Sequence, residues 1–504
     1  MFTSVDNRSE GSALARGYVP RPMLFKIGSS IDSGAPLSLY KSLRTEGRSF
    51  LLESVEKSDQ RARFSFVGAG PKAVVTVKNR IFEVEFSRED SELKDILASR
   101  LCSFANVVEE DSTLKGMINE EIDLFDALRC TIPTSDYRTR FGRQAFLGGG
   151  IGYLAYDLVR ERFGQISSSS TPDAQFGIFN SAVIFDHLKD EVFLSLAPFA
   201  EDDVQAMAEE AESLLSELEP ESTLSGDLGA ESVEAGLAEP FEDSIREAKE
   251  HILEGDIFQV VLSRKARIKL KNPDPILLYK RLRKINPSPY TYIFEFGNRT
   301  IVGASPETLF SVYDRNLTVN PIAGTCPRGS SPEEDELLAR KMLDDEKERA
   351  EHVMLVDLGR NDVRCVSKSG TVKVEDFMSV LRYSHVQHIE TTVRGALREE
   401  CDQFDAARAT FPAGTLSGAP KLRAMEIIDD LEGEPRGIYG GGVGYFSSDG
   451  SADFAIAIRS IVLEGDEAVV QAGAGIVSDS DPHNEYMETE RKMAAMKRAL
   501  GVCE

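Results

Sequence analysis

Runs of alternating β-branched, aromatic and polar residues recur along this chain and limit the folds it can adopt. The segment AVVTVKNRIFEVEF at 73–86 alternates as expected for half-buried strands. Further strands are predicted at 181–196, 257–270, 290–296, 300–325, 371–375, 386–396, 438–446, 452–463 and 467–477. Helices are predicted at about 241–254, 333–358, 403–411, 418–431 and 484–500. Long strand runs separated by grouped helices predict an α+β fold with large, mostly antiparallel sheets layered with helices.

Composition indicates a soluble globular protein. The chain has 504 residues, 41% of them hydrophobic, and a formal net charge of −26. This charge argues against nucleic acid and anionic membranes as partners, because both need a basic footprint. The N-terminal residues lack an apolar signal core, there is no run of 18 apolar residues, and the six cysteines are scattered. We therefore expect a cytoplasmic location.

Composition shifts predict four segments. Residues 1–20 are expected to form a flexible arm, and 21–200 an N-terminal domain that contributes strands to the sheets. Residues 201–240 read as an acidic helix followed by a linker, since their second half is rich in Glu, Ser and Gly and poor in bulky apolar residues. The densest pattern, at 241–504, predicts the main domain.

Two pairs of glutamates predict a metal site. Glu348 and Glu351 are spaced i,i+3 in one predicted helix, and Glu485 and Glu488 are spaced the same way in another. Each pair therefore shares one helix face. Four carboxylates that converge from two helices would suit Mg²⁺, which prefers oxygen ligands. Taken alone, either pair is more often a solvated helix face.

Small-residue segments next to these helices could bind an anion. Gly473, Ala474 and Gly475 follow a strand and precede the second glutamate helix, so their backbone N–H groups could meet a carboxylate near the cation. Gly324 and Thr325 form a similar turn, and Thr415 is a candidate donor in FPAGTLSGAPK at 411–421. The simpler reading of each segment is a plain turn.

Four further side chains are candidates for the same site. Arg459 ends a strongly apolar strand and would need an anionic partner if buried. Glu307 follows a proline at a strand end, a plausible place for a tuned acid. His388, in an alternating strand, and Lys492, after the second glutamate pair, are the other two candidates. A strand histidine is usually structural, and Lys492 could simply form an i,i+4 ion pair with Glu488.

These strings together resemble the chorismate-utilising enzymes. The match spans about 241–500 and rests, in order, on GASPE, PIAGT, KERAEHVMLVDLGRND, HVQHI, FPAGTLSGAPK, IYGGGVGYF, AIAIRS and GAGIVSDSDPHNEYMET. The N-terminal half matches more loosely, through LLES at 51–54 and RFSFVG at 63–68. The resemblance implies the two-sheet α/β sandwich of that family.

The resemblance also implies a role for each matched residue. Mg²⁺ would be held by Glu351 and Glu488, with Glu348 and Glu485 beside them. Glu307 would protonate the C4 hydroxyl as it leaves, and Lys492 would help to hold a carboxylate of the substrate. His388 and Thr415 would line the reacting face. Contacts with chorismate would come from Gly324, Thr325, Tyr439, Arg459 and the backbone of Gly473, Ala474 and Gly475.

Two positions discriminate between branches of the family. Members that add water at ring C2 resemble one another in carrying a lysine base where this chain has Gln259, and the aminodeoxychorismate branch carries a lysine where it has Ala323. The resemblance therefore implies amination at C2 by ammonia, with Gln259 in the site, followed by loss of pyruvate to give anthranilate for tryptophan biosynthesis. The rivals are an isochorismate-forming isomerase, an aminodeoxychorismate synthase, a non-catalytic tryptophan sensor and a simple Mg²⁺-binding protein.

The same resemblance implies a partner and an inhibitor. None of the six cysteines lies in the GxCxG-like setting of a glutaminase nucleophile, so ammonia should come from a separate glutamine amidotransferase subunit. LLES resembles the family's feedback site for L-tryptophan, which makes 21–200 a regulatory domain as well. Its pocket would be formed by Glu53, Ser54, Pro289, Tyr290, Thr291, Val443 and Tyr445.

Overall fold

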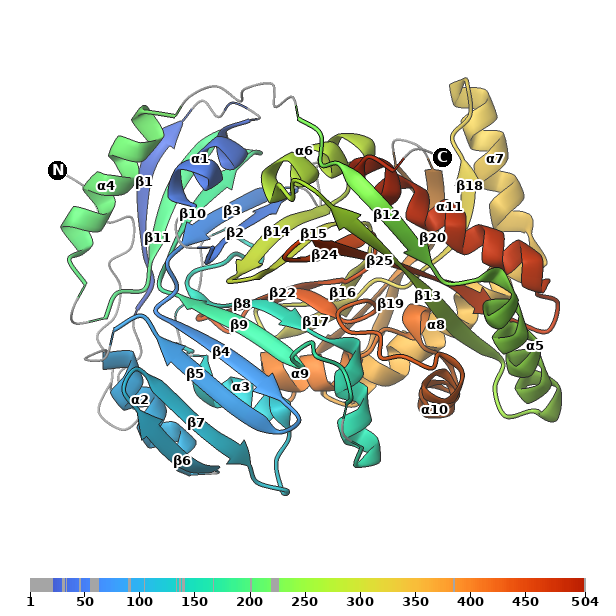
Figure 1. The fold of residues 1–504 in the computed structure, drawn as a ribbon, viewed down its shortest axis with the longest axis horizontal. Helices are drawn as coiled ribbons and strands as arrows, with labels where there is room; N and C mark the ends of the chain where they lie inside the picture. Colours follow the sequence, from blue (N-terminus) through green and yellow to red (C-terminus); the bar gives the residue numbers. More distant parts are fainter. Residues whose placement is uncertain are drawn as a thin grey trace.

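The chain folds around two large antiparallel sheets in the computed structural model (Figure 1). The structure describes residues 21–502 except 30–31, 33, 45–46, 55–62, 89–91, 104, 133, 136, 138–140, 166, 200–201, 219–225 and 384–385. The predicted arm at 1–20 therefore lies outside the described residues. The predicted fold class, α+β with large antiparallel sheets, is confirmed.

The first sheet combines strands from both halves of the chain. Its order is β1 (Met23–Ser29), β11 (Glu191–Leu196), β10 (Ser181–Asp186), β3 (Phe64–Ala69), β2 (Ser49–Glu53), β14 (Tyr290–Phe296), β15 (Arg299–Ser305), β24 (Ser460–Glu464), β25 (Glu467–Ile476), β13 (Gln259–Leu270) and β12 (Ala230–Ala235). The short β21 (Gly418–Ala419) also pairs with β13. The pairing of β2 with β14 joins the N-terminal and C-terminal halves.

The second sheet is built in the same way. Its order is β18 (Ile322–Pro327), β20 (Val386–Ala396), β17 (Asn316–Val319), β16 (Thr308–Tyr313), β23 (Ala452–Ile456), β22 (Gly442–Ser447), β8 (Gly149–Leu154), β9 (Ala174–Phe179), β4 (Ala73–Lys78), β5 (Ile81–Phe86), β7 (Thr113–Ile118) and β6 (Ala105–Glu110). In addition, β19 (Lys373–Arg382) pairs with β20. Here the pairing of β8 with β22 joins the two halves.

Helices cover the outer faces of this two-sheet sandwich. The helices are α1 (Ala35–Leu43), α2 (Glu92–Leu101), α3 (Leu124–Thr131), α4 (Val204–Ser216), α5 (Ala238–Glu254), α6 (Pro275–Ile285), α7 (Pro332–Asp344), α8 (Glu346–Arg364), α9 (Gln403–Thr410), α10 (Lys421–Leu431) and α11 (Pro482–Leu500). Two 3₁₀ turns, η1 (Tyr156–Phe163) and η2 (Gly414–Leu416), complete the described elements. Figure 1 shows α1 and α6 over the first sheet and α3 and α9 under the second. No helix among the described residues is long and apolar enough to cross a membrane.

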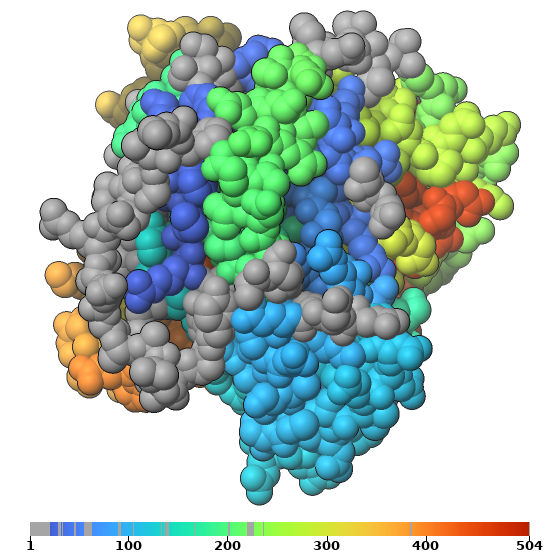
Figure 2. Space-filling view, turned by 90° about the vertical axis from the view of Figure 1, so that its left-hand side faces the viewer, coloured from blue at the N-terminus to red at the C-terminus, as the bar shows by residue number. Residues whose placement is uncertain are grey.

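Three buried clusters hold these layers together. One lies between the sheets and is rich in aromatic residues, with Phe50, Phe66, Tyr292 and Tyr445 among its members. The second joins the first sheet to α1, α4, α6 and α11, and the third joins mainly the second sheet to α2, α3, α8, α9 and α10. Figure 2 shows α4, in green, lying across the blue N-terminal strands, and the residues around 80–120 forming a lobe below them.

Three local differences from the predicted elements have clear causes. The helix predicted at 333–358 is split into α7 and α8 by Asp345, which is extended (φ −69°, ψ 118°) and accepts hydrogen bonds from the first turn of α8. The helix predicted from 418 begins at Lys421, because Gly418 and Ala419 pair with β13. Residues 230–235, predicted as linker, form the edge strand β12, whose polar side chains suit an edge exposed to water.

Paired glycines bring β8 and β22 close to their neighbours. Gly152 lies opposite Gly444, and a Cβ on Gly152 would come within 1.9 Å of the Gln175 carbonyl oxygen. We expect Gly152→Ala to lower the free energy of unfolding by about 1–3 kcal/mol or more, because the clash is with backbone. Urea unfolding measures this. Gly236→Ala, where the nearest atom would be 3.8 Å away, should change little. Equal losses in the two variants would contradict the steric explanation.

Candidate active site

The predicted glutamate pairs lie near the N-terminal ends of two helices. Asp345 caps α8 by accepting from the N–H groups of Lys347 and Glu348 at 2.9 and 3.0 Å. Asp481 caps α11 by accepting from Asn484 N–H at 2.9 Å, with Pro482 as the first helical residue. The positive end of each helix dipole favours negative charge in these turns. Local sequence therefore places Glu348 and Glu351 on α8, and Glu485 and Glu488 on α11, where carboxylates are tolerated.

The four half-buried carboxylates influence one another across the two helices. Burial raises the pKa of Glu348, and the charges of Glu351 on the same helix and Glu488 on α11 raise it further. Burial also raises the pKa of Glu485, and the Glu488 charge adds to that. Like charges are held together here at a cost, which a bound cation would relieve. The effect of Glu488 on Glu348 is an interaction between α11 and α8.

The carboxylates are not closed around a common point in this structure. Glu488 Oε1 lies 2.6 Å from Lys492 Nζ, and Glu351 Oε1 accepts from Gln259 Nε2 at 3.1 Å. Among the described residues, the ligand-type groups that lie within 4.8 Å of one another are elsewhere, at His251, Glu254 and Asp256. Asp256 there is paired with Arg423 at 2.7 Å.

The donor set nevertheless fits Mg²⁺. All four candidate side chains offer carboxylate oxygens, the ligand type that this hard cation prefers. Gly324 adds space beside them, since a Cβ at that position would lie 3.2 Å from Glu348 Oε2.

Arg459, Lys492 and the backbone near Gly473 form a second side of the site, which we call the wall. Arg459 joins β23 to β24 in a left-handed conformation with φ 52°, which is uncommon for arginine, and its Nη1 donates to the Lys492 carbonyl oxygen at 2.6 Å. Burial lowers the pKa of Arg459, and the Glu488 charge opposes this shift. Tyr439 lies against Gly473, where a Cβ would come within 2.9 Å of the tyrosine hydroxyl. Two of the predicted substrate contacts, Tyr439 and Arg459, therefore lie at this wall.

The backbone at Gly473–Gly475 has one edge free of strand pairing. In this part of β25 the chain pairs with β13, whereas its pairing with β24 ends at Val470. Lys492 Nζ donates to the Gly473 carbonyl oxygen at 2.9 Å, so that carbonyl points away from β13. In a strand the N–H and C=O of one residue point to the same side, and every second residue repeats this direction. The N–H groups of Gly473 and Gly475 therefore face the site, separated by Ala474.

Glu307 is a buried carboxyl group between β15 and β16. Its side chain accepts a hydrogen bond from the Thr415 hydroxyl at 2.8 Å. Burial raises the pKa of Glu307 to about 8, against the opposing effects of the Thr415 hydroxyl and the Lys492 charge. A carboxyl group with such a pKa is protonated at neutral pH and can act as an acid.

His388 lies on β20 beside a bulge in β18. Its Nδ1 is 2.8 Å from the Gly324 carbonyl oxygen and 3.1 Å from the Thr325 hydroxyl. The register of β18 shifts between Ala323 and Cys326, which turns Gly324, with φ 65°, toward α8. Burial lowers the pKa of His388, and the Arg459 charge lowers it further. A neutral ring that donates from Nδ1 leaves Nε2 as the acceptor.

Gln259 begins β13 and is 5% exposed. Its Nε2 contacts Glu351, while its Oε1 accepts no hydrogen bond from the described residues. A buried amide oxygen without a donor is costly and commonly marks a ligand position. A Cβ at Gly475 would come within 2.7 Å of Gln259 Nε2, so that glycine gives the amide its room.

A separate cavity of about 640 Å³ contains all seven residues predicted for the inhibitor. We call it the inter-sheet cavity, because Glu53, Ser54, Pro289, Tyr290 and Thr291 approach from the first sheet and Val443 and Tyr445 from the second. The Ser54 hydroxyl donates to the Pro289 carbonyl oxygen at 2.8 Å. Glu53 is held by Arg283 at 2.9 Å and by the Tyr279 hydroxyl.

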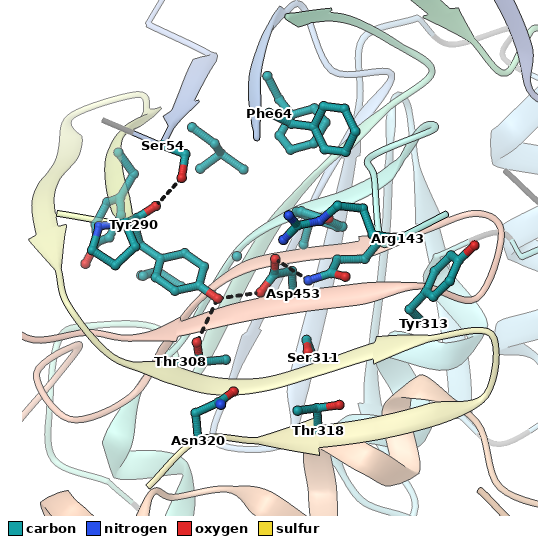
Figure 3. Close-up of a pocket in the computed structure, with 18 of the residues that line it drawn as sticks. Ser54, Phe64, Arg143, Tyr290, Thr308, Ser311, Tyr313, Thr318, Asn320 and Asp453 are labelled. Carbon is teal, nitrogen blue, oxygen red and sulfur yellow. Dashed lines mark hydrogen bonds between the residues drawn. The ribbon is translucent and has the colours of Figure 1, made fainter. Parts of the chain in front are cut away.

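Sequence reasoning missed several residues of this cavity. Arg143 and Gln144 lie in a segment with no recognised motif, and Asp453 lies on β23 (Figure 3). The signal for Asp453 was available, since it is an acidic residue within the apolar strand ADFAI. Outside this cavity, the ion pair between Asp362 and Lys421, at 2.6 Å, was also missed, and it joins α8 to the FPAGTLSGAPK segment.

Comparisons with known proteins agree with this geometry. A family model described as chorismate binding enzyme matches residues 135–498. The anthranilate synthase component 1 of Thermococcus kodakarensis is 47% identical, covering 93% of this chain and 98% of that protein. The anthranilate synthase component 1 2 of Haloarcula marismortui is also 47% identical, over 95% of this chain and 93% of that protein.

The chain belongs to the chorismate-binding enzymes, in the family of anthranilate synthase component 1. The crystal structure of anthranilate synthase component I from Streptococcus pneumoniae has a TM-score of 0.73 and 34% identity, covering 94% of this chain and 99% of that one. The menaquinone-specific isochorismate synthase MenF from Escherichia coli, at 19% identity and a TM-score of 0.66, shares the fold. The predicted family is thus confirmed over nearly the full length of the chain.

Proposed function

We propose that this chain is the chorismate-aminating subunit of an anthranilate synthase, which converts chorismate and ammonia to anthranilate and pyruvate. The observation that carries the proposal is one site with two distinct kinds of carboxyl group. The half-buried glutamates of α8 and α11 gather oxygen ligands, whereas the fully buried Glu307 stays protonated at neutral pH. Family membership supports the same reaction.

Chorismate carries two carboxylates, and the site offers a partner for each. Glu351 and Glu488, with Glu348 and Glu485 beside them, would hold Mg²⁺, which when bound neutralises the ring carboxylate and withdraws electron density from C2. The second carboxylate would be held by Arg459 and by the N–H groups of Gly473 and Gly475. Lys492 reaches both Glu488 and the Gly473 carbonyl oxygen, so it can hold either carboxylate when the site fills.

Ammonia needs orientation more than activation, and Gln259 supplies it. The unpaired Gln259 Oε1 would accept an N–H of ammonia and direct its lone pair to C2. As the C–N bond forms and the ring double bonds shift, the C4–O bond breaks, and Glu307 gives its proton to the departing hydroxyl to form water. The new ammonium group then loses a proton to water, which leaves a neutral amine on C2. Thr415 keeps the Glu307 carboxyl group in place.

The second step removes the enolpyruvyl group. Loss of the C2 proton and cleavage of the C3–O bond make the ring aromatic, and the enolpyruvate released takes up a proton to become pyruvate. We assign the C2 proton to Nε2 of His388, because the Nδ1 contact with Gly324 and the lowered pKa keep that nitrogen available as a base.

At the matched positions, this chain lacks the residue that each of the two rival enzymatic activities needs. Addition of water at C2 calls for a base, and Gln259 is not one. A lysine nucleophile is absent at Ala323, which is 9% exposed on β18. A non-catalytic sensor or a simple metal-binding protein would not need a buried acid bonded to Thr415.

The proposal also assigns a partner and an inhibitor. Burial raises the pKa of Cys326 and Cys401 and raises that of Cys130 to about 11, so these thiols stay protonated and are poor nucleophiles. Ammonia would therefore come from a separate glutamine amidotransferase subunit. L-Tryptophan would occupy the inter-sheet cavity at Ser54 and Tyr290 as a feedback inhibitor.

One assay tests both the reaction and the partner. The isolated chain is incubated with chorismate and MgCl₂, with either ammonium or glutamine as nitrogen source, and anthranilate fluorescence is followed. We expect fluorescence with ammonium, and less than about one hundredth of that rate with glutamine, because none of the six cysteines lies in the sequence setting of a glutaminase nucleophile. Product without fluorescence would indicate one of the rival reactions. Equal rates with glutamine would contradict the requirement for a partner.

A further inference from the structure

The residues on either side of Glu307 line a cavity that Glu307 does not line, and Thr308 also lines a small cavity beside Glu307 and Thr415. Pro306 and Thr308 line the inter-sheet cavity, whereas the Glu307 carboxyl group is bonded to Thr415 in the proposed active site. Successive side chains of an extended chain point to opposite faces, so this separation follows from local geometry. The register of β16 against β23 also shifts between Thr308 and Phe310, which is the kind of irregularity that re-aims a side chain next to a site.

A directed chain of hydrogen bonds connects Thr308 to the residues of the inter-sheet cavity (Figure 3). The Tyr290 hydroxyl donates to Asp453 Oδ1 at 2.9 Å and lies 2.9 Å from the Thr308 hydroxyl. Since the tyrosine proton is directed to the carboxylate, its oxygen accepts from Thr308. Gln144 Nε2 donates to Asp453 Oδ2 at 3.1 Å and fixes the far end.

The opposite side of Glu307 is anchored to the second sheet. The Glu307 carbonyl oxygen accepts from Ile456 N–H at 3.0 Å, and the Pro306 carbonyl oxygen accepts from the Tyr383 hydroxyl at 3.2 Å. With the backbone held at these points, the Thr308 hydroxyl links the segment at 306–308 to Tyr290 by a hydrogen bond, whereas Pro306 lines the cavity without a polar side chain. Thr308 and Tyr290 are both half-buried, so their hydrogen bond is shielded from bulk water.

We infer, building on the proposed function, that Tyr290 and Thr308 are positioning residues for the acid Glu307, and that a ligand in the inter-sheet cavity acts on catalysis through this pair. The ligand class is an aromatic amino acid, which would pack against the Tyr290 ring and compete for its hydroxyl. A Tyr290 side chain drawn toward the ligand releases Thr308, and the Glu307–Thr415 contact one residue away loses its support. Binding of the aromatic amino acid and binding of chorismate are then coupled, because each ligand prefers a different arrangement of the segment at 306–308.

Thr308→Val tests this inference, since it removes the hydroxyl and keeps the shape. The full chain is assayed with ammonium, and tryptophan affinity is measured by calorimetry with and without chorismate. We expect tryptophan to bind the free variant within about twofold of wild type, while the factor by which chorismate weakens that binding falls about tenfold, within the usual range of such coupling. The alkaline limb of the kcat profile should also move, because Lys492 and Thr415, the groups that act on Glu307, would face a displaced carboxyl group.

Ser311→Ala is the matched control. Ser311 lines the same cavity from the same strand, and its removal leaves the bond between Thr308 and Tyr290 intact. Tyr290→Phe is the second variant, with the same expected loss of coupling, should Thr308→Val fold poorly. An active Thr308→Val enzyme with unchanged coupling and an unchanged pH profile would overturn the inference alone. A wild-type chain that makes no anthranilate would overturn the proposed function instead.

Discussion

Replacing Glu351 or Glu488 by glutamine should lower Mg²⁺-dependent anthranilate formation by about 10³-fold or more. A bound cation that stabilises developing charge is worth several kcal/mol, and each factor of ten in rate corresponds to about 1.4 kcal/mol. Glutamine keeps the shape of each side chain and can still accept from Gln259 or Lys492. The fold should therefore survive. Steady-state rates with saturating ammonium give the effect on turnover, and calorimetric titration with MgCl₂ gives the effect on metal affinity.

Asp357→Asn is the control for the metal assignment. Asp357 lies on the same helix, α8, but is exposed and paired with Arg360 at 3.0 Å. The substitution removes one negative charge from α8 without removing a candidate ligand. Activity and Mg²⁺ affinity should therefore stay within about twofold of wild type, as expected for an exposed ion pair. Full Mg²⁺ affinity in both glutamine variants would refute the metal site, even if their turnover fell.

Replacing Glu307 by glutamine should lower kcat by about 10²–10⁴-fold, the usual contribution of a general acid. Chorismate binding should change far less, because this carboxyl group acts on the leaving hydroxyl and not on the substrate carboxylates. The dependence of the wild-type kcat on pH gives a second test. Glu307 donates a proton only when protonated and its pKa is raised to about 8, so kcat should fall as pH rises through about 8.

The Glu307→Gln variant should lose that alkaline limb along with its rate. Thr415→Val should move the limb to higher pH, because the Thr415 hydroxyl lowers the pKa of Glu307 and its removal lets the pKa rise. Glu467→Gln, at the exposed start of β25, is a control that should leave both the rate and the profile unchanged. A Glu307→Gln variant with the wild-type pH profile would show that another group is the acid.

Much of the site could be predicted because its elements are local. The i,i+3 spacing of Glu348 with Glu351, and of Glu485 with Glu488, depends only on helix geometry. Helix formation there follows from the caps Asp345 and Asp481, which are encoded a few residues upstream. The break between α7 and α8 was missed because the helical pattern continues through Asp345, and only the extended backbone of that residue reveals the break.

The inter-sheet cavity shows the limit of the same approach. Ser54, Tyr290 and Tyr445 were predicted through a family resemblance, and their residues do line one cavity. The acidic residue in the apolar strand marks Asp453 as unusual, but neither its segment nor that of Gln144 indicates that the two residues meet near Tyr290. Their partners are distant in sequence, and such contacts are set by how two sheets pack.

The order of the residues was enough to predict most strands and capped helices, the carboxylates that share a helix face, and the family that the chain resembles. Those properties depend on neighbours within a few residues. The packing of the elements was needed to see that Glu348 on α8 interacts with Glu488 on α11, that Gly473 and Gly475 have no strand neighbour on one edge of β25, and that Thr308 meets Tyr290. These arrangements depend on strand pairing and burial between elements far apart in the chain. Their stability is a property of the whole fold and cannot be read from any one segment.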